Sequence, residues 1–154
     1  MLQENDIVPN FKLPATDGKV FELAALEKQT LILYFYPKDA TPGCTTEAEQ
    51  FRDLAEEFRR NNCLIAGISR DSIASHEKFK ARYNLPFDLL SDTEETVCTL
   101  FSVIRMKNMY GKQVRGIERS TFIIRPDRTL AHAYRNVKAP GHAAEILRII
   151  QSSD

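Results

Sequence analysis

The stretch Leu31–Tyr36 is the strongest constraint on the fold, because it is a continuous apolar run rich in β-branched and aromatic residues. Such a run is typical of a strand buried on both faces of a sheet. Pro37 ends it, and apolar residues then recur at helical spacing through about Arg60, which predicts a long amphipathic helix. The run Cys63–Ser69 predicts a second buried strand. A strand, a helix and another buried strand in succession indicate an α/β sheet.

The remaining elements continue this alternation. The segment Met106–Gly116 lacks clear periodicity and is expected to be a loop or a mobile hairpin. Ser91–Glu94 has the residues of a capping box that opens a helix. The other expected elements are a helix over Ser72–Tyr83, a strand over Phe87–Leu90, a β-hairpin over residues 121–134 and a final helix from Pro140. This order predicts a central mixed β-sheet flanked by helices.

Composition and charge narrow the class of function. The 154 residues include 21 Lys plus Arg and 21 Asp plus Glu, so the formal net charge is zero. Affinity for nucleic acid or anionic membranes comes chiefly from many basic contacts to phosphate, so neither is expected as a partner. No apolar run approaches the ~20 residues that span a bilayer, and the first residues are polar where a signal peptide is basic and then apolar. We therefore expect one cytoplasmic domain over residues 1–154 that acts on small molecules.

The three cysteines, Cys44, Cys63 and Cys98, include no Cys-x-x-Cys pair, which argues against a disulfide framework or a zinc ribbon and fits a reducing compartment. Cys44 is distinctive because it follows a buried strand at the expected start of the long helix. With Thr41 as N-cap and Pro42 in the first helical position, Cys44 lies in the first turn, where the helix dipole favours the reactive thiolate. The alternative is a small buried residue at a helix start, and the spacing alone leaves both interpretations open.

The segment around Cys44 resembles that of a known enzyme family. The spacing Pro37-x-x-x-Thr41-x-x-Cys44 matches the signature of peroxiredoxins. The fuller segment Phe35–Glu47 is similar to the peroxiredoxin Q subfamily, also called bacterioferritin comigratory protein. Three further segments resemble the same subfamily, in the same order along the chain: Asp6–Gly18, Leu89–Asp92 and Arg119–Ile124. The likeness covers nearly the whole chain and implies a thioredoxin-like fold with a thiol peroxidase site.

The resemblance also implies roles for individual residues. Cys44 is expected to be the peroxidatic cysteine, which attacks the terminal oxygen of hydrogen peroxide or an organic hydroperoxide and becomes a sulfenic acid. Thr41 is expected to hydrogen-bond the thiolate and the peroxide, Arg119 to stabilise charge on the sulfur and the leaving oxygen, and Pro37 to shield the sulfur. Glu47 matches the motif in a supporting role. No cofactor or metal is expected, and without the family match Arg119 would be interpreted as a solvent-facing strand residue.

One position departs from the subfamily pattern. Many members carry a resolving cysteine five positions after the peroxidatic one, and here that position is Glu49. We therefore expect a one-cysteine mechanism, in which a thiol reductant such as thioredoxin, or glutaredoxin with glutathione, reduces the Cys44 sulfenic acid directly. Cys63 and Cys98 are interpreted as packing residues, and an atypical two-cysteine cycle through Cys98 is the alternative. Members of the subfamily are often monomers, and a monomer is expected here.

Two other functions fit parts of the pattern. A thiol-disulfide oxidoreductase would need a second cysteine within Cys44–Glu47, which this chain lacks. A redox sensor or binding module that is oxidised at Cys44 without turnover stays open, although Thr41 and Arg119 favour turnover. The three histidines lie outside these motifs and are expected to be surface or core residues: His76, His132 and His142.

Overall fold

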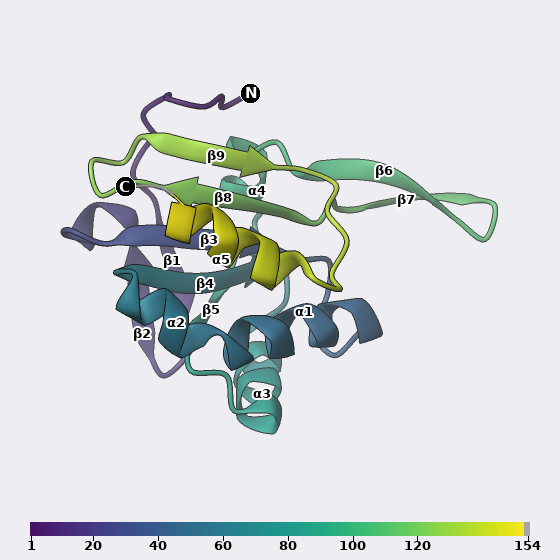
Figure 1. Cartoon of the computed structure of the whole chain (residues 1–154). Coiled ribbons are helices and arrows are strands. Elements are labelled where there is room, and N and C mark those ends of the chain that lie inside the picture. Colours follow the sequence, from purple (N-terminus) through teal and green to yellow (C-terminus); the bar gives the residue numbers. More distant parts are fainter. Residues whose placement is uncertain (153–154) are drawn as a thin grey trace.

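A computed structural model describes residues 1–152 of the chain (Figure 1). The strands are β1 (Lys12–Ala15), β2 (Lys19–Glu22), β3 (Thr30–Phe35), β4 (Cys63–Ser69), β5 (Asp88–Ser91), β6 (Ile104–Met109), β7 (Lys112–Ile117), β8 (Ser120–Ile124) and β9 (Leu130–Tyr134). Seven of them form one sheet in the order β2-β1-β5-β4-β3-β8-β9, and β6 pairs with β7 in a separate two-stranded sheet. Because β3, β4 and β5 run parallel and the other neighbours antiparallel, the predicted mixed sheet is confirmed.

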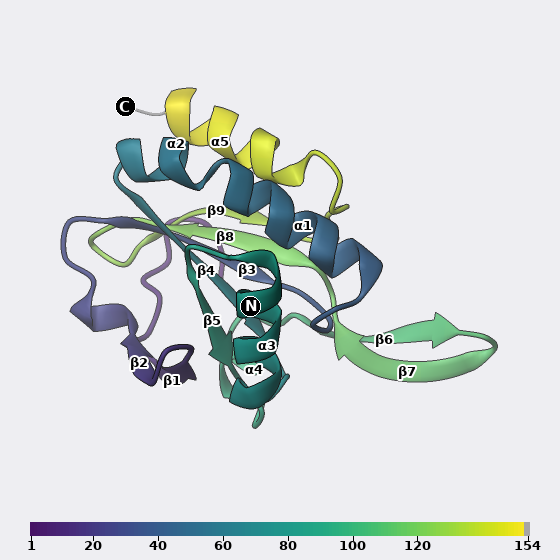
Figure 2. The same ribbon diagram turned by 90° about the horizontal axis from the view of Figure 1, so that it is seen from below.

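Helices cover both faces of this sheet. They are α1 (Pro42–Asp53), α2 (Ala55–Arg60), α3 (Ile73–Tyr83), α4 (Thr96–Leu100) and α5 (His142–Ser152), with a short 3-10 helix at Leu23–Ala25. Figure 2 shows α1, α2 and α5 side by side over the same face of the sheet. The side chains of α1, α2, α3 and α5 enter one hydrophobic cluster, while those of α4 and the N-terminal segment enter another.

Strand β3 lies at the centre of the molecule, between β4 and β8. Its side chains alternate between the two hydrophobic clusters, because successive residues of a strand point to opposite faces. Leu31, Leu33 and Phe35 pack into the cluster with α4, whereas Ile32 and Tyr34 pack into the cluster with α1. This burial on both faces is what the uninterrupted apolar run predicts. The carboxyl end of β3 then delivers the chain to α1, and this end of a parallel strand is where α/β proteins place their ligands.

The predicted helix through Arg60 is interrupted at Leu54. This residue leaves helical geometry, with φ −104° and ψ 4°, and separates α1 from α2. Phe51 and Phe58 on either side of the interruption pack into the same hydrophobic cluster. The apolar spacing therefore continues across the break, which is why it predicts one helix where the structure has two.

The predicted capping box at Ser91–Glu94 is wrong. Ser91 belongs to β5, and Glu95, with φ 63°, is the residue that precedes α4. The carboxylate of Asp92 instead accepts hydrogen bonds from the N–H groups of Val97 (3.2 Å) and Cys98 (2.7 Å). A side-chain oxygen still serves the start of the helix, but it comes from a different residue because the strand extends further than expected.

The segment expected to be a loop or mobile hairpin is a regular β-hairpin. Strands β6 and β7 pair in register from Ile104 with Ile117 to Met109 with Lys112, and Tyr110 and Gly111, both with positive φ, form the turn. The hairpin projects from the body of the molecule in both ribbon views (Figures 1 and 2). Most of its side chains are exposed or half-buried, so no buried face imposes a period of two on the sequence.

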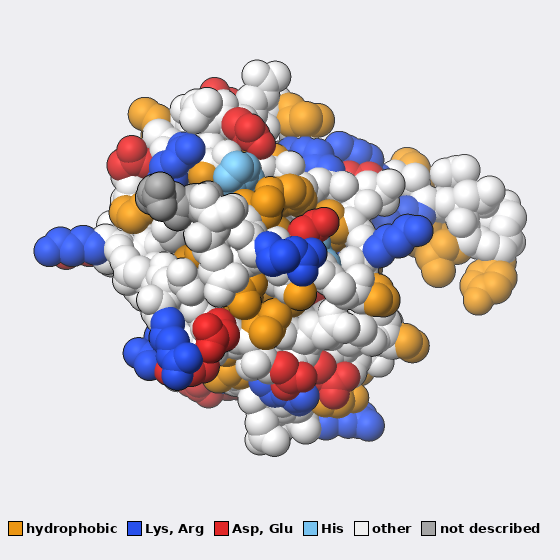
Figure 3. Space-filling view, viewed as in Figure 1, with side chains coloured by type: hydrophobic (Ala, Val, Ile, Leu, Met, Phe, Trp, Pro, Cys, Tyr) orange, Lys and Arg blue, Asp and Glu red, His pale blue; other side chains and the backbone are white. Residues whose placement is uncertain are grey.

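The face drawn in Figure 3 carries basic and acidic side chains interspersed, in keeping with the zero net charge. Hydrophobic side chains are visible on the projecting hairpin, whose large exposed apolar residues are Met106, Met109, Tyr110 and Val114. None of the helices within residues 1–152 has the length and apolar character needed to cross a membrane.

Candidate active site

Cys44 lies in the first turn of α1, where the sequence places it. Thr41 is the N-cap residue in an extended conformation, and Pro42 follows in the first turn. Proline is favoured there because the first N–H groups of a helix have no helical partner. The Cys44 side chain is buried, with 2% of its surface exposed. The free cysteine is thus enclosed at the positive end of the helix dipole, which stabilises a negative charge on its sulfur.

Arg119 brings a second positive charge to the sulfur. It lies between β7 and β8, and its backbone carbonyl is held by the N–H of Val137 at 3.0 Å. Its Nη2 donates to Cys44 Sγ at 3.5 Å. The guanidinium is always protonated and presents several donors in a rigid fork, so it favours a thiolate and can also contact an oxygen bound beside it. The structure thus brings together two residues that lie 75 positions apart in the sequence.

Glu47 is the second partner of this guanidinium. It is fully buried, and its Oε1 accepts a hydrogen bond from Arg119 Nη1 at 2.7 Å. Its other oxygen, Oε2, is buried without a hydrogen-bond partner among the described residues. Burial raises the pKa of Glu47 to about 7, although the charge of Arg119 acts in the opposite direction. The carboxyl group therefore orients Arg119, which fits the supporting role expected of Glu47.

Gly43 leaves the space in which the guanidinium sits. A Cβ atom at this position would lie 3.1 Å from Arg119 Nη2, closer than an ordinary van der Waals contact. The absence of a side chain at this residue is therefore what allows Arg119 to approach the first turn of α1.

Thr41 takes its expected position, but its hydroxyl makes a different contact from the expected ones. It donates to the carbonyl of Lys38 at 2.8 Å and makes no capping hydrogen bond to α1. Because the hydroxyl proton is used in this way, its lone pairs remain available to accept a hydrogen bond from a bound molecule.

Pro37 and Arg119 line an open hollow of about 460 Å³ beside the site. The other lining residues are Arg105, Met106, Lys107, Glu118, Asn136 and Val137. Burial and the neighbouring charge of Arg119 lower the pKa of Lys107. Cys44 does not itself line the hollow, although its partner Arg119 does.

The other two cysteines lie far from this arrangement. Cys98 is fully buried in the hydrophobic cluster on the opposite side of the sheet from Cys44. Cys63 begins β4 beside Thr30, at the end of β3 remote from α1. Burial raises the pKa of Cys63 to about 11, and burial and Asp92 raise that of Cys98 further. Both side chains are free thiols in packed surroundings, in agreement with their interpretation as packing residues.

Glu49 occupies the usual resolving position on α1. Its side chain is 40% exposed, and it lies 3.9 Å from the guanidinium of Arg52 on the same helix. The three histidines divide as expected between surface and core: His132 is half-buried, whereas His76 and His142 are buried.

Comparison with known proteins places this site in a family. The sequence profile of the AhpC/TSA family matches residues 5–133, which is most of the chain. Peroxiredoxin Bcp of Xanthomonas campestris is 46% identical over 144 residues, which cover 92% of this chain and 90% of the relative. Peroxiredoxin Bcp of Bacillus subtilis is 43% identical over 143 residues, which cover 93% of this chain and 91% of the relative.

Solved structures agree with these relatives. A cysteine-to-serine variant of PrxQ from Xylella fastidiosa superposes with a TM-score of 0.94 at 40% identity, over 99% of this chain and 97% of that protein. The bacterioferritin comigratory protein of Xanthomonas campestris superposes with a TM-score of 0.87 at 45% identity, over 92% of this chain and 90% of that protein. The chain therefore belongs to the AhpC/TSA family. The names of its relatives confirm the resemblance to the peroxiredoxin Q subfamily, and with it the thioredoxin-like fold and an enzyme of the thiol peroxidase class.

Proposed function

We propose that Cys44 is the residue at which this peroxiredoxin reduces hydroperoxides. The observation that supports this most directly is the 3.5 Å approach of Arg119 to a buried sulfur at a helix N-terminus. The thiolate attacks the terminal oxygen, the O–O bond breaks, and the departing oxygen takes a proton to leave as water or an alcohol. Cys44 is oxidised to a sulfenic acid while the peroxide is reduced.

The remaining site residues assist this step in our proposal. Arg119 stabilises negative charge as it passes from the sulfur to the departing oxygen, which is the effect of a preorganised donor. Thr41 accepts a hydrogen bond from the peroxide through the lone pairs that its contact with Lys38 leaves free. Pro37 shields the sulfur from the hollow beside it.

Both hydrogen peroxide and organic hydroperoxides are proposed as substrates. The hollow beside Pro37 is open to solvent and large enough for an alkyl chain. The related Xanthomonas campestris protein is described by its alkyl peroxide reduction activity, which favours the same substrate class here.

Regeneration is proposed to follow a one-cysteine route, with an external thiol as reductant. That thiol attacks the sulfenic sulfur and releases water, and a second thiol cleaves the mixed disulfide and restores Cys44. The positions of Cys63 and Cys98 support this route, because neither side chain can meet Cys44 without large movements of the sheet or its core. Thioredoxin, or glutaredoxin with glutathione, fits the chemistry of the reductant, and we propose a monomer acting in the cytoplasm.

Two measurements test this function. Hydroperoxide consumption with a thiol donor is compared between the wild type and Cys44→Ser, and repeated turnover by the wild type alone is expected. Mass spectrometry after one equivalent of peroxide should then show one added oxygen on Cys44. An internal disulfide that Cys98→Ser abolishes would establish the atypical two-cysteine cycle instead. Stoichiometric consumption without turnover, whatever the donor, would identify a redox sensor.

A further inference from the structure

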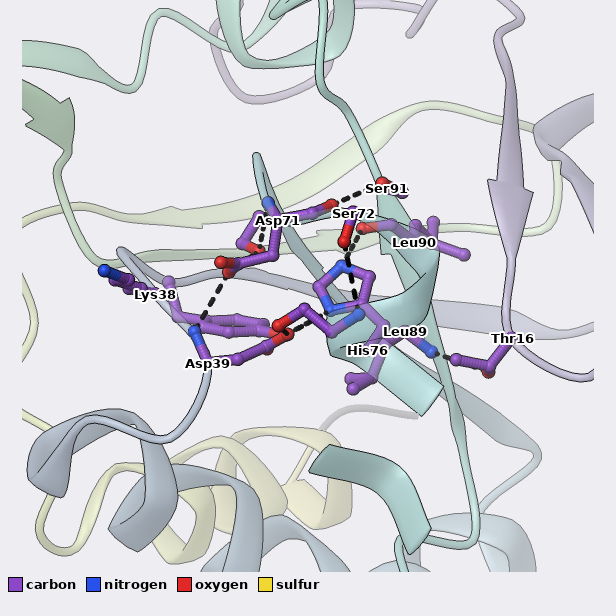
Figure 4. Close-up of polar contacts among 12 residues, drawn as sticks. Thr16, Lys38, Asp39, Asp71, Ser72, His76, Leu89, Leu90 and Ser91 are labelled. Atoms are coloured by element: carbon purple, nitrogen blue, oxygen red, sulfur yellow. Dashed lines mark hydrogen bonds and ion pairs between the residues drawn. The ribbon is translucent and has the colours of Figure 1, made fainter. Parts of the chain in front are cut away.

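His76 lies outside the proposed chemistry, yet it occupies the centre of a buried polar cluster next to the active-site loop. It extends from α3, and its side chain is fully buried. Figure 4 shows the ring between Asp39 and the chain at Leu90. Nδ1 lies 2.7 Å from Asp39 Oδ2, and Nε2 lies 2.9 Å from the carbonyl oxygen of Leu90.

These two contacts join the ring to both of its neighbours. A carbonyl oxygen can only accept, so Nε2 carries a proton and donates to Leu90. Asp39 also accepts hydrogen bonds from the Tyr36 hydroxyl at 2.5 Å and the Ser75 hydroxyl at 2.8 Å. The ring therefore connects the chain at Leu90 to a carboxyl group that two further side chains hold in place.

Asp71, in the loop before α3, belongs to the same cluster, and the polar atoms of Asp39, Asp71 and His76 lie within 4.8 Å of one another. Its Oδ2 accepts a hydrogen bond from the Ser69 hydroxyl at 2.6 Å. The Tyr36 hydroxyl lies 3.4 Å from Nδ1, and burial and Asp39 raise the pKa of Tyr36, so it stays a neutral donor. The cluster thus ties α3 and β5 to the loop that follows β3.

Asp39 transmits this arrangement to the site. It lies in the Pro37–Thr41 loop, between the two motif residues, and its backbone N–H donates to Asp71 Oδ2 at 2.9 Å. The next residue, Ala40, has φ 63°, a left-handed conformation that a non-glycine residue adopts only when its surroundings impose it. The contacts of Asp39 with His76, Ser75 and Asp71 are such surroundings.

We propose that His76 is a positioning residue for the peroxide reaction: bonded to both Leu90 and Asp39, it fixes Asp39, and through Asp39 the loop that carries Pro37 and Thr41 around Cys44. The proposal rests on the proposed function of Cys44. It assigns to α3 an influence on the rate of a reaction that none of its side chains touches.

The bridge is tested first, on the unaltered protein. Long-range ¹⁵N–¹H correlation spectra of the imidazole rings identify which ring nitrogens carry protons. The Nε2 proton of His76 should be visible and should exchange slowly with solvent, because it is buried and bonded to the carbonyl of Leu90. The half-buried His132 is the control, and its ring protons should exchange fast. A His76 Nε2 without a proton, or with one that exchanges as fast as those of His132, would overturn the proposal.

The positioning role is tested by the rate constant for Cys44 oxidation by hydrogen peroxide. H76L removes both hydrogen bonds of the ring, and a misplaced loop should slow oxidation about tenfold or more. H76Q keeps a hydrogen-bonding amide and should recover part of the rate, which a loss of packing alone does not predict. H132Q is the matched control and should react like the wild type.

D39N supplies a second variant in case H76L does not fold. Its amide replaces one acceptor oxygen of Asp39 by a donor, so the side chain can no longer accept all the hydrogen bonds of Tyr36, Ser75 and His76, and Cys44 oxidation should slow. A folded H76L or D39N variant that oxidises within twofold of the wild-type rate would refute the positioning role and leave the function of Cys44 intact. Failure of the wild type to be oxidised at Cys44 would refute the proposed function itself, while the spectra would still report the contacts of His76.

Discussion

Arg119 and Glu47 form an ion pair, in which a guanidinium nitrogen of the partly buried arginine lies 2.7 Å from an oxygen of the fully buried carboxyl group. This pair fixes the direction of the guanidinium, because a fork held at one nitrogen presents the other in a defined direction. Its second nitrogen consequently lies 3.5 Å from the sulfur of Cys44. Helix α1 thus contributes both the reactive sulfur, from its first turn, and the carboxyl group that orients Arg119, from its second.

Arg119→Lys should slow peroxide reduction strongly even though it preserves the charge. A single ammonium group cannot contact Glu47 and Cys44 in the way that the two nitrogens of the fork do. Removal of one preorganised donor typically costs about 10²- to 10³-fold in rate. The measurement is the rate constant of Cys44 oxidation, and Arg125→Lys, at an exposed site after β8, is the matched control. Equal rates for the two variants would contradict the role of Arg119.

Gly43→Ala should lower activity without lowering stability. Alanine favours a helix over glycine by up to about 1 kcal/mol, so the melting temperature should stay constant or rise. The added methyl group would lie 3.1 Å from Arg119 Nη2 and displace the guanidinium by a few tenths of an ångström. We expect oxidation of Cys44 to slow by about tenfold. A variant as active as the wild type would show that Arg119 tolerates the shift.

Thr41→Val should reduce activity while leaving the start of α1 in place. The hydroxyl makes no capping hydrogen bond, so its loss removes only the bond to Lys38, worth about 0.5–1.5 kcal/mol. Peroxide turnover should fall at least about tenfold, because the acceptor proposed for the peroxide is gone. Thr41→Ser keeps the hydroxyl and should retain most of the activity. Turnover assays and thermal melts of both variants check this, and a large loss of stability in Thr41→Val alone would argue for a capping role.

Glu47→Gln should change how stability depends on pH. The pKa of Glu47 is about 7 in the folded protein against an ordinary value of 4.5. Between these values the folded chain binds more protons than the unfolded one, so the free energy of unfolding contributed by Glu47 falls as pH rises and levels off above about pH 7. The full effect is on the order of 3 kcal/mol.

The Gln variant cannot titrate at this position, so relative to the wild type it should be more stable at pH 8 than at pH 5. Urea denaturation at the two pH values measures this difference. Glu49→Gln, on the exposed side of the same helix, should run parallel to the wild type. A parallel course for Glu47→Gln as well would show that Arg119 keeps the carboxylate charged throughout.

The main sheet could be predicted from the sequence because its central strands are apolar on both faces. Leu31–Tyr36 and Cys63–Ser69 have no polar face to obscure their length, and both become strands of the parallel centre. The projecting hairpin of β6 and β7 could not be predicted in the same way, since it packs neither face against a core. The break at Leu54 could not be predicted from the apolar spacing either. The packing of Phe51 and Phe58 depends on their spacing along the chain and not on the helical hydrogen bonds between them.

The site was predictable where its chemistry is local and much less so where it is assembled from distant segments. Thr41, as N-cap, and Pro42, in the first helical position, predict from the sequence alone that a helix starts at Cys44. The pairing of Glu47 with Arg119 joins residues 72 positions apart, and only the family resemblance pointed to the arginine. His76 was predicted only as a surface or core residue, because its partners come from different loops and strands and form no motif. The sequence feature that could have pointed to its burial is its position one helical turn inside α3, in a predominantly polar segment.

The 2% exposure of Cys44 imposes different demands on the two halves of the proposed cycle. A peroxide presents two oxygen atoms and needs only a narrow approach, whereas a thiol reductant must bring its own sulfur to within about 2 Å to form a bond. In the proposed cycle a protein thiol can therefore reach the sulfur only when the residues that cover Cys44 move aside. Until then a second peroxide can carry the sulfenic acid on to sulfinic acid, which is irreversible except for enzymatic rescue in some peroxiredoxins. On this proposal, how often the sulfur is uncovered sets both the speed of repair and the lifetime of the enzyme under oxidative load.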